Sequence, residues 1–233
     1  NVAESLYGTL QKKVDDAGDT GMQFPILTDV AIKVGLAKIS EWSFRNVPNE
    51  ITMYSSLYYW LKTTRPELKS VYGGVEEDFA HSRASWHVVM KERASANGYS
   101  VLGESKWLLN DTNFSTQVRE IKKANPDILS IAAHPFTTCG LLKEMQRQGV
   151  KPKLLVGLTS TSSLETMQGC AKQAEGMMIP TSFAPVTKDG KAAADATAKF
   201  KGNADLHSMA AWANMFILKQ VRESEKISCN PKQ

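Results

Sequence analysis

Short apolar runs alternate with amphipathic segments through the middle of the chain, between residues 68 and 180. Four of the runs predict buried strands, at 68–74, 100–103, 128–133 and 153–157. Between them, apolar residues recur every three or four positions, which predicts helices over 79–97, 113–124 and 137–149. A repeated order of strand, helix and strand predicts a parallel sheet with helices on both faces. The expected fold class is therefore α/β.

The flanking segments predict further elements of the same two kinds. Before the central array we expect strands at 23–28 and 42–47 and helices at 29–36 and 50–64. After it we expect a strand at 176–180, a linker at 181–190 and helices at 192–200 and 206–223. Asp205 or Asn203 would cap the last helix.

Composition adds little beyond excluding some partners. The chain has 233 residues, 42% of them hydrophobic and 22% charged, as is ordinary for a globular protein. The net charge of +4 is spread along the chain, with no basic run longer than Lys12-Lys13 or Lys122-Lys123. A nucleic-acid partner would need a concentrated basic face, so we expect none.

The sequence contains no apolar window of the roughly 18 residues that a membrane-spanning helix needs. Asn1-Val2-Ala3-Glu4 lacks the basic and apolar regions of a signal peptide, so we expect that any such peptide has been removed. The three cysteines, Cys139, Cys170 and Cys229, lie far apart and form no Cys-x-x-Cys pair. This spacing argues against a zinc cluster, and it permits one disulfide without implying it.

No motif for catalysis or for a cofactor is found. The chain has no phosphate-binding loop, dinucleotide fingerprint, zinc-protease helix or serine nucleophile elbow. Cys139 follows His134 by five residues, but we interpret it as a packed structural thiol. Glu76-Glu77-Asp78 could hold a cation, although solvated acidic residues ahead of a helix are the simpler interpretation. We therefore expect no enzyme activity, no cofactor and no metal.

Candidate binding residues cluster in three loops that follow predicted strands, at 74–82, 134–138 and 158–162. In parallel sheets the ligand site lies at the carboxyl ends of the strands. Helices expected to begin near Phe79, Thr137 and Ser162 would direct unpaired N–H groups toward an anion there. Aromatic walls and orienting hydroxyls suit a small ligand. Five residues fit this description: Phe79, His134, Phe136, Thr159 and Ser160.

Several blocks together resemble a known family. The blocks are Phe24-Pro25-Ile26-Leu27-Thr28, Trp42-Ser43-Phe44-Arg45, Asp111-Thr112-Asn113-Phe114-Ser115, Asn125-Pro126-Asp127-Ile128, the helix Leu141 to Gly149, and Ala174-Glu175-Gly176-Met177. They are similar to the branched-chain amino acid (leucine/isoleucine/valine) branch of the periplasmic binding proteins, the type I two-lobed solute receptors of ABC importers. The resemblance covers about residues 15 to 224.

This resemblance implies two lobes joined by a hinge, which close around a small ligand. Lobe one would comprise residues 1–46 and 184–233, and lobe two residues 47–183. The expected function is a monomeric receptor in the periplasm, or at the outer face of the cytoplasmic membrane, that delivers its ligand to an ABC permease.

The resemblance also assigns roles to residues. Phe79 would cover the ligand, His134 would be a second cleft aromatic that makes affinity depend on pH, and Thr28 with Val30 to Ile32 would offer donors to a carboxylate. Leu158 stands where amino-acid-binding members carry the acidic residue that holds the ammonium group. A buried ammonium without a partner is costly, so we expect a carboxylate with an apolar or aromatic body. Apart from the resemblance, their spacing with other apolar residues predicts a place in the core for Trp42, Trp60, Trp86 and Trp107, whereas Trp212 is a candidate for the rim of the site.

Alternatives remain open at this point. A ligand-sensing regulator on the same fold, or a branched-chain amino acid binder, would fit the same pattern. Full members of the family are longer, and the resemblance implies that segments are missing near 11–12, 20–21, 201–202 and 223–224. We expect lobe one to be incomplete in this sequence, which would then be a set of ordered pieces of a longer chain.

Overall fold

The computed structural model describes residues 5–8, 25–29, 31, 33–200, 202 and 204–225. The chain divides into two compact units. Unit 1 comprises Asn1–Asn49 and Ser182–Gln233, and unit 2 comprises Glu50–Thr181. The expected joins after residue 11 and residue 20, and the proposed ligand contacts Val30 and Ile32, lie outside the described residues.

A four-stranded parallel sheet forms the centre of unit 2. Its strands are β3 (Ser70–Glu76), β4 (Ser100–Trp107), β5 (Ile128–Ala132) and β6 (Leu154–Gly157). Their order is β4-β3-β5-β6, so the first strand of the unit lies inside the sheet. The predicted parallel α/β sheet is confirmed.

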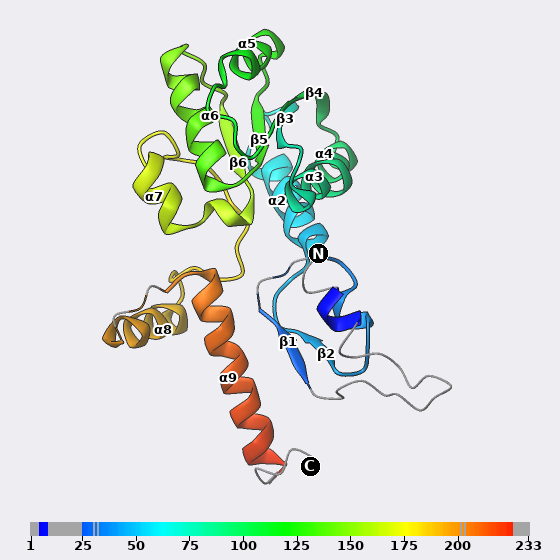
Figure 1. Cartoon of the computed structure of the whole chain (residues 1–233), viewed down its shortest axis with the longest axis vertical. Helices are drawn as coiled ribbons and strands as arrows, with labels where there is room; N and C mark the ends of the chain where they lie inside the picture. The colour runs from blue at the N-terminus through cyan, green and yellow to red at the C-terminus, as the bar shows by residue number, and fades with distance from the viewer. Residues whose placement is uncertain are drawn as a thin grey trace. The chain divides into compact units, whose positions relative to one another are not determined.

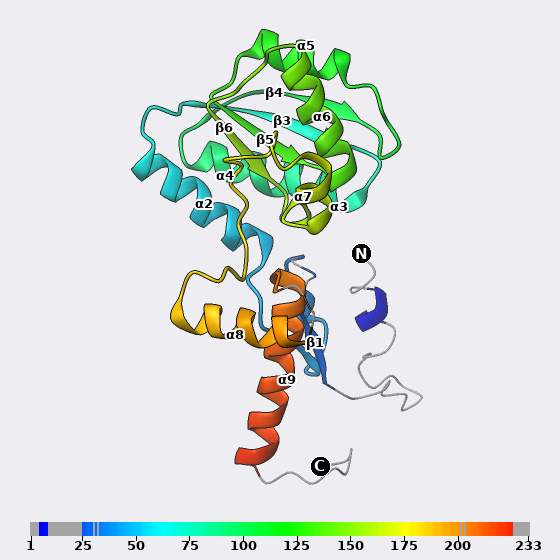
Figure 2. The same cartoon turned by 90° about the vertical axis from the view of Figure 1, so that its left-hand side faces the viewer.

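Helices cover both faces of this sheet, as Figure 2 shows. One face carries α2 (Glu50–Thr64), followed along the chain by α3 (Ala80–Ala84), a π-helical turn at Ser85–Met90 and α4 (Lys91–Ala96). The other carries α5 (Ser115–Ala124) and α6 (Pro135–Arg147), and the short α7 (Leu164–Cys170) contacts α6. The helix expected at 79–97 is therefore continuous but contains a π segment.

Each face of the sheet has its own apolar core. Large members of the α2 side are Tyr54, Tyr58, Leu61, Trp86, Met90, Ile128 and Leu158. Large members of the α5–α6 side are Trp107, Phe114, Val118, Ile121, Leu129, Ile131 and Leu141. Burial on both faces explains why the strands consist of nearly continuous apolar runs instead of alternating ones.

Three tryptophans test the expectation that most tryptophans belong to the core. Trp86 and Trp107 are buried, as expected. Trp60 is 46% exposed on α2, so its assignment to the core is wrong. It occupies the outer face of a helix whose inner face is filled by Tyr54, Tyr58 and Leu61.

A disulfide joins α6 to α7 through Cys139 and Cys170. Both sulfur-bearing side chains are buried. Cys139 is packed and structural, as expected, but its sulfur forms a disulfide and is not a thiol. Spacing along the sequence could not reveal the pair, because only the fold brings these two helices together.

Unit 1 contains a parallel pair of short strands, β1 (Ile26–Thr28) and β2 (Ser43–Arg45), drawn in blue in Figure 1. A 3₁₀ turn at Leu36–Lys38 lies between them in sequence. The later part of the unit forms α8 (Lys188–Lys199) and α9 (Leu206–Ser224). Asp205 caps α9 with its side chain, as expected, and Ser208 completes a capping box.

Three expected elements differ from the structure. The described residues of 29–36 form no α-helix, only turns that lead into the 3₁₀ segment. The strand expected at 176–180 is reduced to a single bridge between Val156 and Met178. Helix α8 begins at Lys188, inside the expected linker, because the Thr187 side chain accepts a hydrogen bond from the Gly190 N–H and caps it. None of the described helices has the length and apolar character needed to span a membrane.

Candidate ligand-binding site

The carboxyl ends of β3, β5 and β6 bring three loops to one edge of the unit 2 sheet. Because β3 and β6 both pair with β5, the segments after Glu76, Ala132 and Gly157 are neighbours in space. These are the three loops in which the sequence placed binding residues. The edge of a parallel sheet is also where such folds bind ligands.

Two predicted aromatic residues meet at this edge. The rings of Phe79 and His134 pack edge to face, with their centroids 4.3 Å apart. Phe79 is 38% exposed, and the His134 side chain is 29% exposed. The pair thus presents a partly open aromatic wall, and the packing of each ring on the other limits its rotation.

The carboxylate of Glu76, the last residue of β3, lies beneath this wall. Glu76 is fully buried and accepts four hydrogen bonds, so the expectation of a solvated acidic cluster is wrong for this residue. Its donors are the hydroxyl of Thr137 at 2.6 Å, that of Ser82 at 3.4 Å, the backbone N–H of His134 at 3.4 Å and the His134 Nδ1. A buried carboxylate is tolerated when its acceptor sites are satisfied in this way.

Sequence reasoning missed the role of Glu76, although one signal was present. Glu76 directly follows Gly74-Val75 at the end of an apolar run, and β3 extends to include it. Because helices cover both faces of the sheet, the side chain of the last residue of β3 also lies in the interior. Its acidic neighbours behave differently: Glu77 is half-buried and pairs with His87 and Lys106, and Asp78 is exposed.

The contact with Glu76 determines how His134 faces the site. Since Nδ1 is held by the carboxylate, the other ring nitrogen, Nε2, is directed away from it. No described residue lies within hydrogen-bond distance of Nε2. When Nδ1 donates to Glu76, a neutral ring offers Nε2 as an acceptor and a protonated ring offers it as a donor.

Two hydrogen bonds fix the end of β6 and the loop that follows it. Tyr54 of α2 donates from its hydroxyl to the Gly157 carbonyl at 3.0 Å, and Ser160 donates to the Ala133 carbonyl at 3.4 Å. Burial, reinforced by the nearby Glu50 carboxylate and Tyr58, raises the pKa of Tyr54. The phenol therefore stays protonated and remains a donor. The first bond ties the end of β6 to α2, and the second ties the third loop to the second.

The structure places Leu158 and Thr159 away from solvent. Leu158 has no exposed surface and belongs to the core on the α2 side, so its side chain contributes no surface to this edge. Thr159 is buried, and Ser160 is half-buried. Of the three predicted residues of this loop, Ser160 alone has appreciable exposed surface.

Helix α3 begins at Ala80 with Phe79 as its N-cap, as expected, but the other two helix N-termini lie at different positions than expected. Helix α6 begins at Pro135, with His134 as its N-cap, because proline suits the first turn of a helix. The expected start at Thr137 is wrong. After β6 there is a 3₁₀ turn at Thr159–Thr161, and α7 begins at Leu164, so the expected start at Ser162 is also wrong.

Phe136 faces a different surface. It is 62% exposed and helps to line a cavity of about 450 Å³ beside the disulfide. Phe114, Lys143 and Glu165 are other lining residues. His134 and Phe79 do not line this cavity. The structure therefore separates Phe136 from the aromatic pair at the sheet edge.

The predicted residues of unit 1 are engaged within that unit. Thr28 is buried, and its hydroxyl shares a hydrogen bond of 2.6 Å with the Tyr7 hydroxyl. Trp212 is half-buried between Phe200 and Phe216, with ring centroids 6.3 and 5.7 Å away. Arg45 donates to the Ala31 carbonyl at 2.9 Å, which ties Ala31 to β2.

Within the described part of the chain, no group of three histidine, cysteine, aspartate or glutamate side chains is arranged to hold a metal ion. The polar groups of the sheet edge are instead a buried carboxylate, an imidazole nitrogen and hydroxyls. Such groups orient a small organic ligand beside an aromatic surface.

Comparison with known proteins identifies the class. The family model described as periplasmic binding protein matches residues 52–225, and the chain belongs to this family. Sequence comparison with curated proteins finds no match. The family consists of solute-binding proteins, and solved structures similar to this chain include substrate-binding proteins of ABC transporters.

Three solved structures illustrate the similarity. The leucine-binding protein LivK of Thermotoga maritima is 13% identical, with a TM-score of 0.73 over 85% of this chain and 57% of its own. LivJ of Streptococcus pneumoniae, in complex with isoleucine, is 15% identical, with a TM-score of 0.71 over 85% of this chain and 57% of its own.

The third is a solute-binding protein of Rhodopseudomonas palustris BisB5 in complex with 3,4-dihydroxybenzoic acid. It is 15% identical, with a TM-score of 0.71 over 99% of this chain and 60% of its own. At these identities the likeness shows the fold, which is the type I periplasmic binding protein fold. The chain spans little more than half the length of these proteins.

Proposed function

We propose that this chain is the ligand-binding receptor of an ABC importer, and that it captures a small carboxylate with an apolar or aromatic body. The observation that carries the proposal is the Phe79–His134 ring pair held by the buried carboxylate of Glu76. It provides a fixed aromatic wall and one free imidazole nitrogen at the edge where this fold class binds ligands.

The ligand class follows from the polar groups at this edge. Glu76 is already satisfied by four donors, and Asp78 accepts from the Leu109 N–H at 2.9 Å, on the β4 side of β3 and away from β5. Neither carboxylate is directed at the space beside His134. A ligand ammonium would therefore lack a partner there, whereas a carboxylate could accept from a protonated His134 Nε2.

We further propose that the protein works outside the cytoplasm, as a monomer, and passes its ligand unchanged to a membrane permease. The buried Cys139–Cys170 disulfide supports the location, because stable disulfides form in oxidising compartments such as the periplasm. The two units would be the two lobes, and closure by a hinge would trap the ligand.

A thermal-shift and calorimetry series tests the proposal. The panel comprises 3,4-dihydroxybenzoate, benzoate, an aliphatic carboxylate, leucine and isoleucine. A bound ligand at a hundred times its Kd stabilises the folded state by about 2.7 kcal/mol. We expect the aromatic carboxylates to bind and to be recovered unchanged, and the amino acids to leave the Tm unaltered.

Variants assign the binding to the site. Phe79→Ala and His134→Ala should each weaken binding at least tenfold, while Trp60→Ala, which removes an exposed aromatic of α2 elsewhere on the unit, should not change it. Binding of leucine or isoleucine alone would keep the receptor role but refute the ligand class. Conversion of any bound compound would refute the receptor role.

A further inference from the structure

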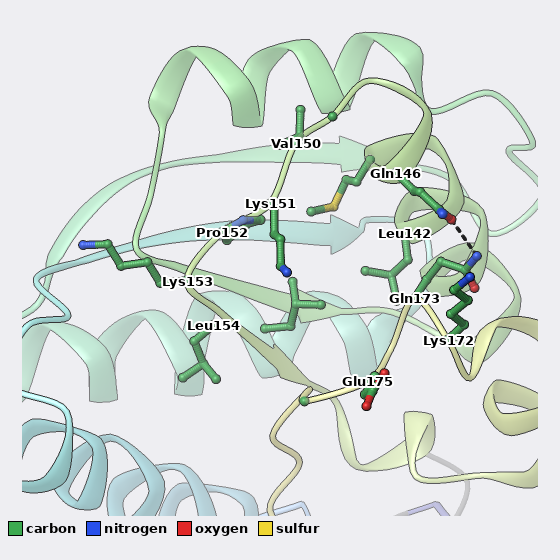
Figure 3. A pocket seen from close by; sticks show the side chains of 14 residues that line it. Leu142, Gln146, Val150, Lys151, Pro152, Lys153, Leu154, Lys172, Gln173 and Glu175 are labelled. Carbon is green, nitrogen blue, oxygen red and sulfur yellow. Dashed lines mark hydrogen bonds between the residues drawn. The ribbon is translucent and has the colours of Figure 1, made fainter.

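A second cavity lies at the opposite end of the unit 2 sheet, where β6 begins (Figure 3). Its volume is about 630 Å³, within the range of small-molecule sites. It lies between the C-terminal turn of α6, the segment 149–155 and the segment 172–176. None of the residues at the Phe79–His134 edge lines it.

The floor of this cavity is aliphatic. Leu142 and Met145 of α6 are buried, and Val150 and Leu155 are half-buried. No aromatic side chain is among the lining residues. A ligand body that fits this floor is an alkyl chain or a saturated ring, because such groups gain free energy from burial without needing polar partners.

Basic side chains border the cavity. In Figure 3 the side chain of Lys151 extends over the floor, and Lys172 lies at the rim. Neither ammonium group is within ion-pair distance of a described acidic residue. Lys153 differs, because it points away from the floor and pairs with Asp127 at 2.7 Å. Glu175 is the one acidic lining residue, so the rim is positive overall.

An unpaired backbone donor also faces this side of β6. The Gly157 N–H donates to Met178 at 2.9 Å, and Met178 donates to the Leu155 carbonyl at 2.9 Å, both at the outer edge of the strand. Since alternate residues of a strand direct their N–H groups to the same side, the Leu155 N–H points outward too. No described residue accepts its hydrogen bond.

We propose that this cavity is a second ligand site, which binds an organic anion with an aliphatic body. The carboxylate accepts from the Leu155 N–H and pairs with the Lys151 ammonium, and the aliphatic body covers Leu142 and Met145. A charge-assisted hydrogen bond and burial of the aliphatic floor act together. The proposal is independent of the proposed function, because it uses the other end of the sheet.

Titration of the isotope-labelled protein with decanoate tests the proposal. The probe is followed by amide chemical shifts in two-dimensional NMR spectra. We expect saturable shifts centred on Leu155, Lys151 and Gly176. Shifts that do not saturate, or that centre on Phe79 and His134, would overturn the proposal.

Three variants sharpen the test. Lys151→Gln should raise the Kd about tenfold, since a hydrogen bond to a charged group contributes about 1.5 kcal/mol or more. Val150→Trp, which fills the cavity, should abolish saturation. Lys153→Gln removes a charge that borders the cavity but points away from its floor and is paired with Asp127, so it should leave the Kd within twofold.

Two control measurements distinguish binding at this cavity from misfolding and from binding at the Phe79–His134 edge. Thermal unfolding of Val150→Trp establishes whether that variant is folded, and Lys151→Gln carries the test if it is not. The variant His134→Ala should retain the shift at Leu155 even if it abolishes binding at the other edge. An unchanged Kd in Lys151→Gln would refute the proposal.

Discussion

Glu76 is the residue on which the candidate site depends. Its buried carboxylate lies next to the aromatic pair and accepts hydrogen bonds from the backbone N–H and the Nδ1 of His134. Its burial is tolerated because four donors surround it. A change that keeps its shape but alters its acceptors should therefore affect both stability and the orientation of His134.

We predict that Glu76→Gln lowers the free energy of unfolding by about 1–3 kcal/mol, because its amide nitrogen would face donors that need an acceptor. The same variant should weaken ligand binding by disturbing His134. Urea unfolding and calorimetry measure the two effects. Glu77→Gln is the matched control, since its half-exposed ion pairs contribute no more than about 1 kcal/mol. Equal losses in both variants would contradict the prediction.

Gly73 leaves the space that Trp86 occupies beside β3. A Cβ atom added at Gly73 would lie 2.4 Å from the Trp86 ring, which is fully buried and cannot withdraw. We predict that Gly73→Ala lowers the free energy of unfolding by about 1–3 kcal/mol through overpacking. In a Trp86→Phe background, where the smaller ring leaves room, Gly73→Ala should lower the free energy of unfolding clearly less than it does in the wild type. Additive losses in urea unfolding would contradict the steric explanation.

At the scale of elements, the sequence predicts the array of unit 2 well. Helix α2 has the predicted bounds, and all four strands appear where apolar runs were found. Both successes rest on burial, since a helix with one buried face and strands buried on both faces leave clear patterns. The short elements of unit 1 were predicted less well, because a strand of three residues leaves almost no pattern.

The candidate site was predicted only in part. The aromatic pair could be located, because the loops after parallel strands meet at one edge. Three other features could not be predicted from the sequence: the burial of Leu158, the role of Glu76 and the disulfide. Each of them depends on which side of a chain segment faces the neighbouring segments. Sequence spacing gives the order of residues, and the direction of a side chain in an irregular loop is determined by tertiary packing.

The disulfide between α6 and α7 closes a loop with a sequence separation of 31. Restricting the unfolded chain in this way stabilises the folded state by roughly 3–4 kcal/mol. We predict a loss of this order in the double variant Cys139→Ala, Cys170→Ala. Adding a reducing agent should destabilise the wild type and leave the double variant unchanged, as monitored by urea unfolding. A wild type insensitive to complete reduction would contradict the prediction.

Asp127 joins the amino ends of β3, β5 and β6. Burial opposes its ionisation, but hydrogen bonds from Lys153 and from the Lys69 and Ser70 N–H groups outweigh that effect and lower its pKa. A carboxyl with a lowered folded-state pKa contributes stability above its unfolded pKa of about 3.9 and loses it as the pH falls through the folded value.

Acid unfolding should therefore depend on this residue. We predict that Asp127→Asn is less stable than the wild type at neutral pH and that this difference shrinks below about pH 4. Urea unfolding between about pH 3 and pH 7 measures it. Asp189→Asn, an exposed carboxyl at the start of α8, is the control and should follow the wild type. A constant difference at every pH would contradict the assignment.

At the scale of the molecule, the two units differ in how complete their cores are. Unit 2 has a four-stranded sheet with helices on both faces and two buried apolar clusters. Unit 1 has a two-stranded parallel pair, and α9 exposes Met215, Phe216, Leu218 and Val221. A parallel pair of this size has little stability alone, because parallel sheets depend on being covered on both faces.

We therefore predict that residues 50–181 fold without the rest of the chain. The isolated segment should unfold cooperatively in urea, with an m-value of about 1–3 kcal/mol/M, and should show near-ultraviolet circular dichroism from the buried Trp86 and Trp107. Its transition should match the more stable phase of the full chain, since both reflect the same sheet. A segment that retains helical signal but lacks near-ultraviolet signal would show that unit 1 supplies packing on which the unit 2 core depends.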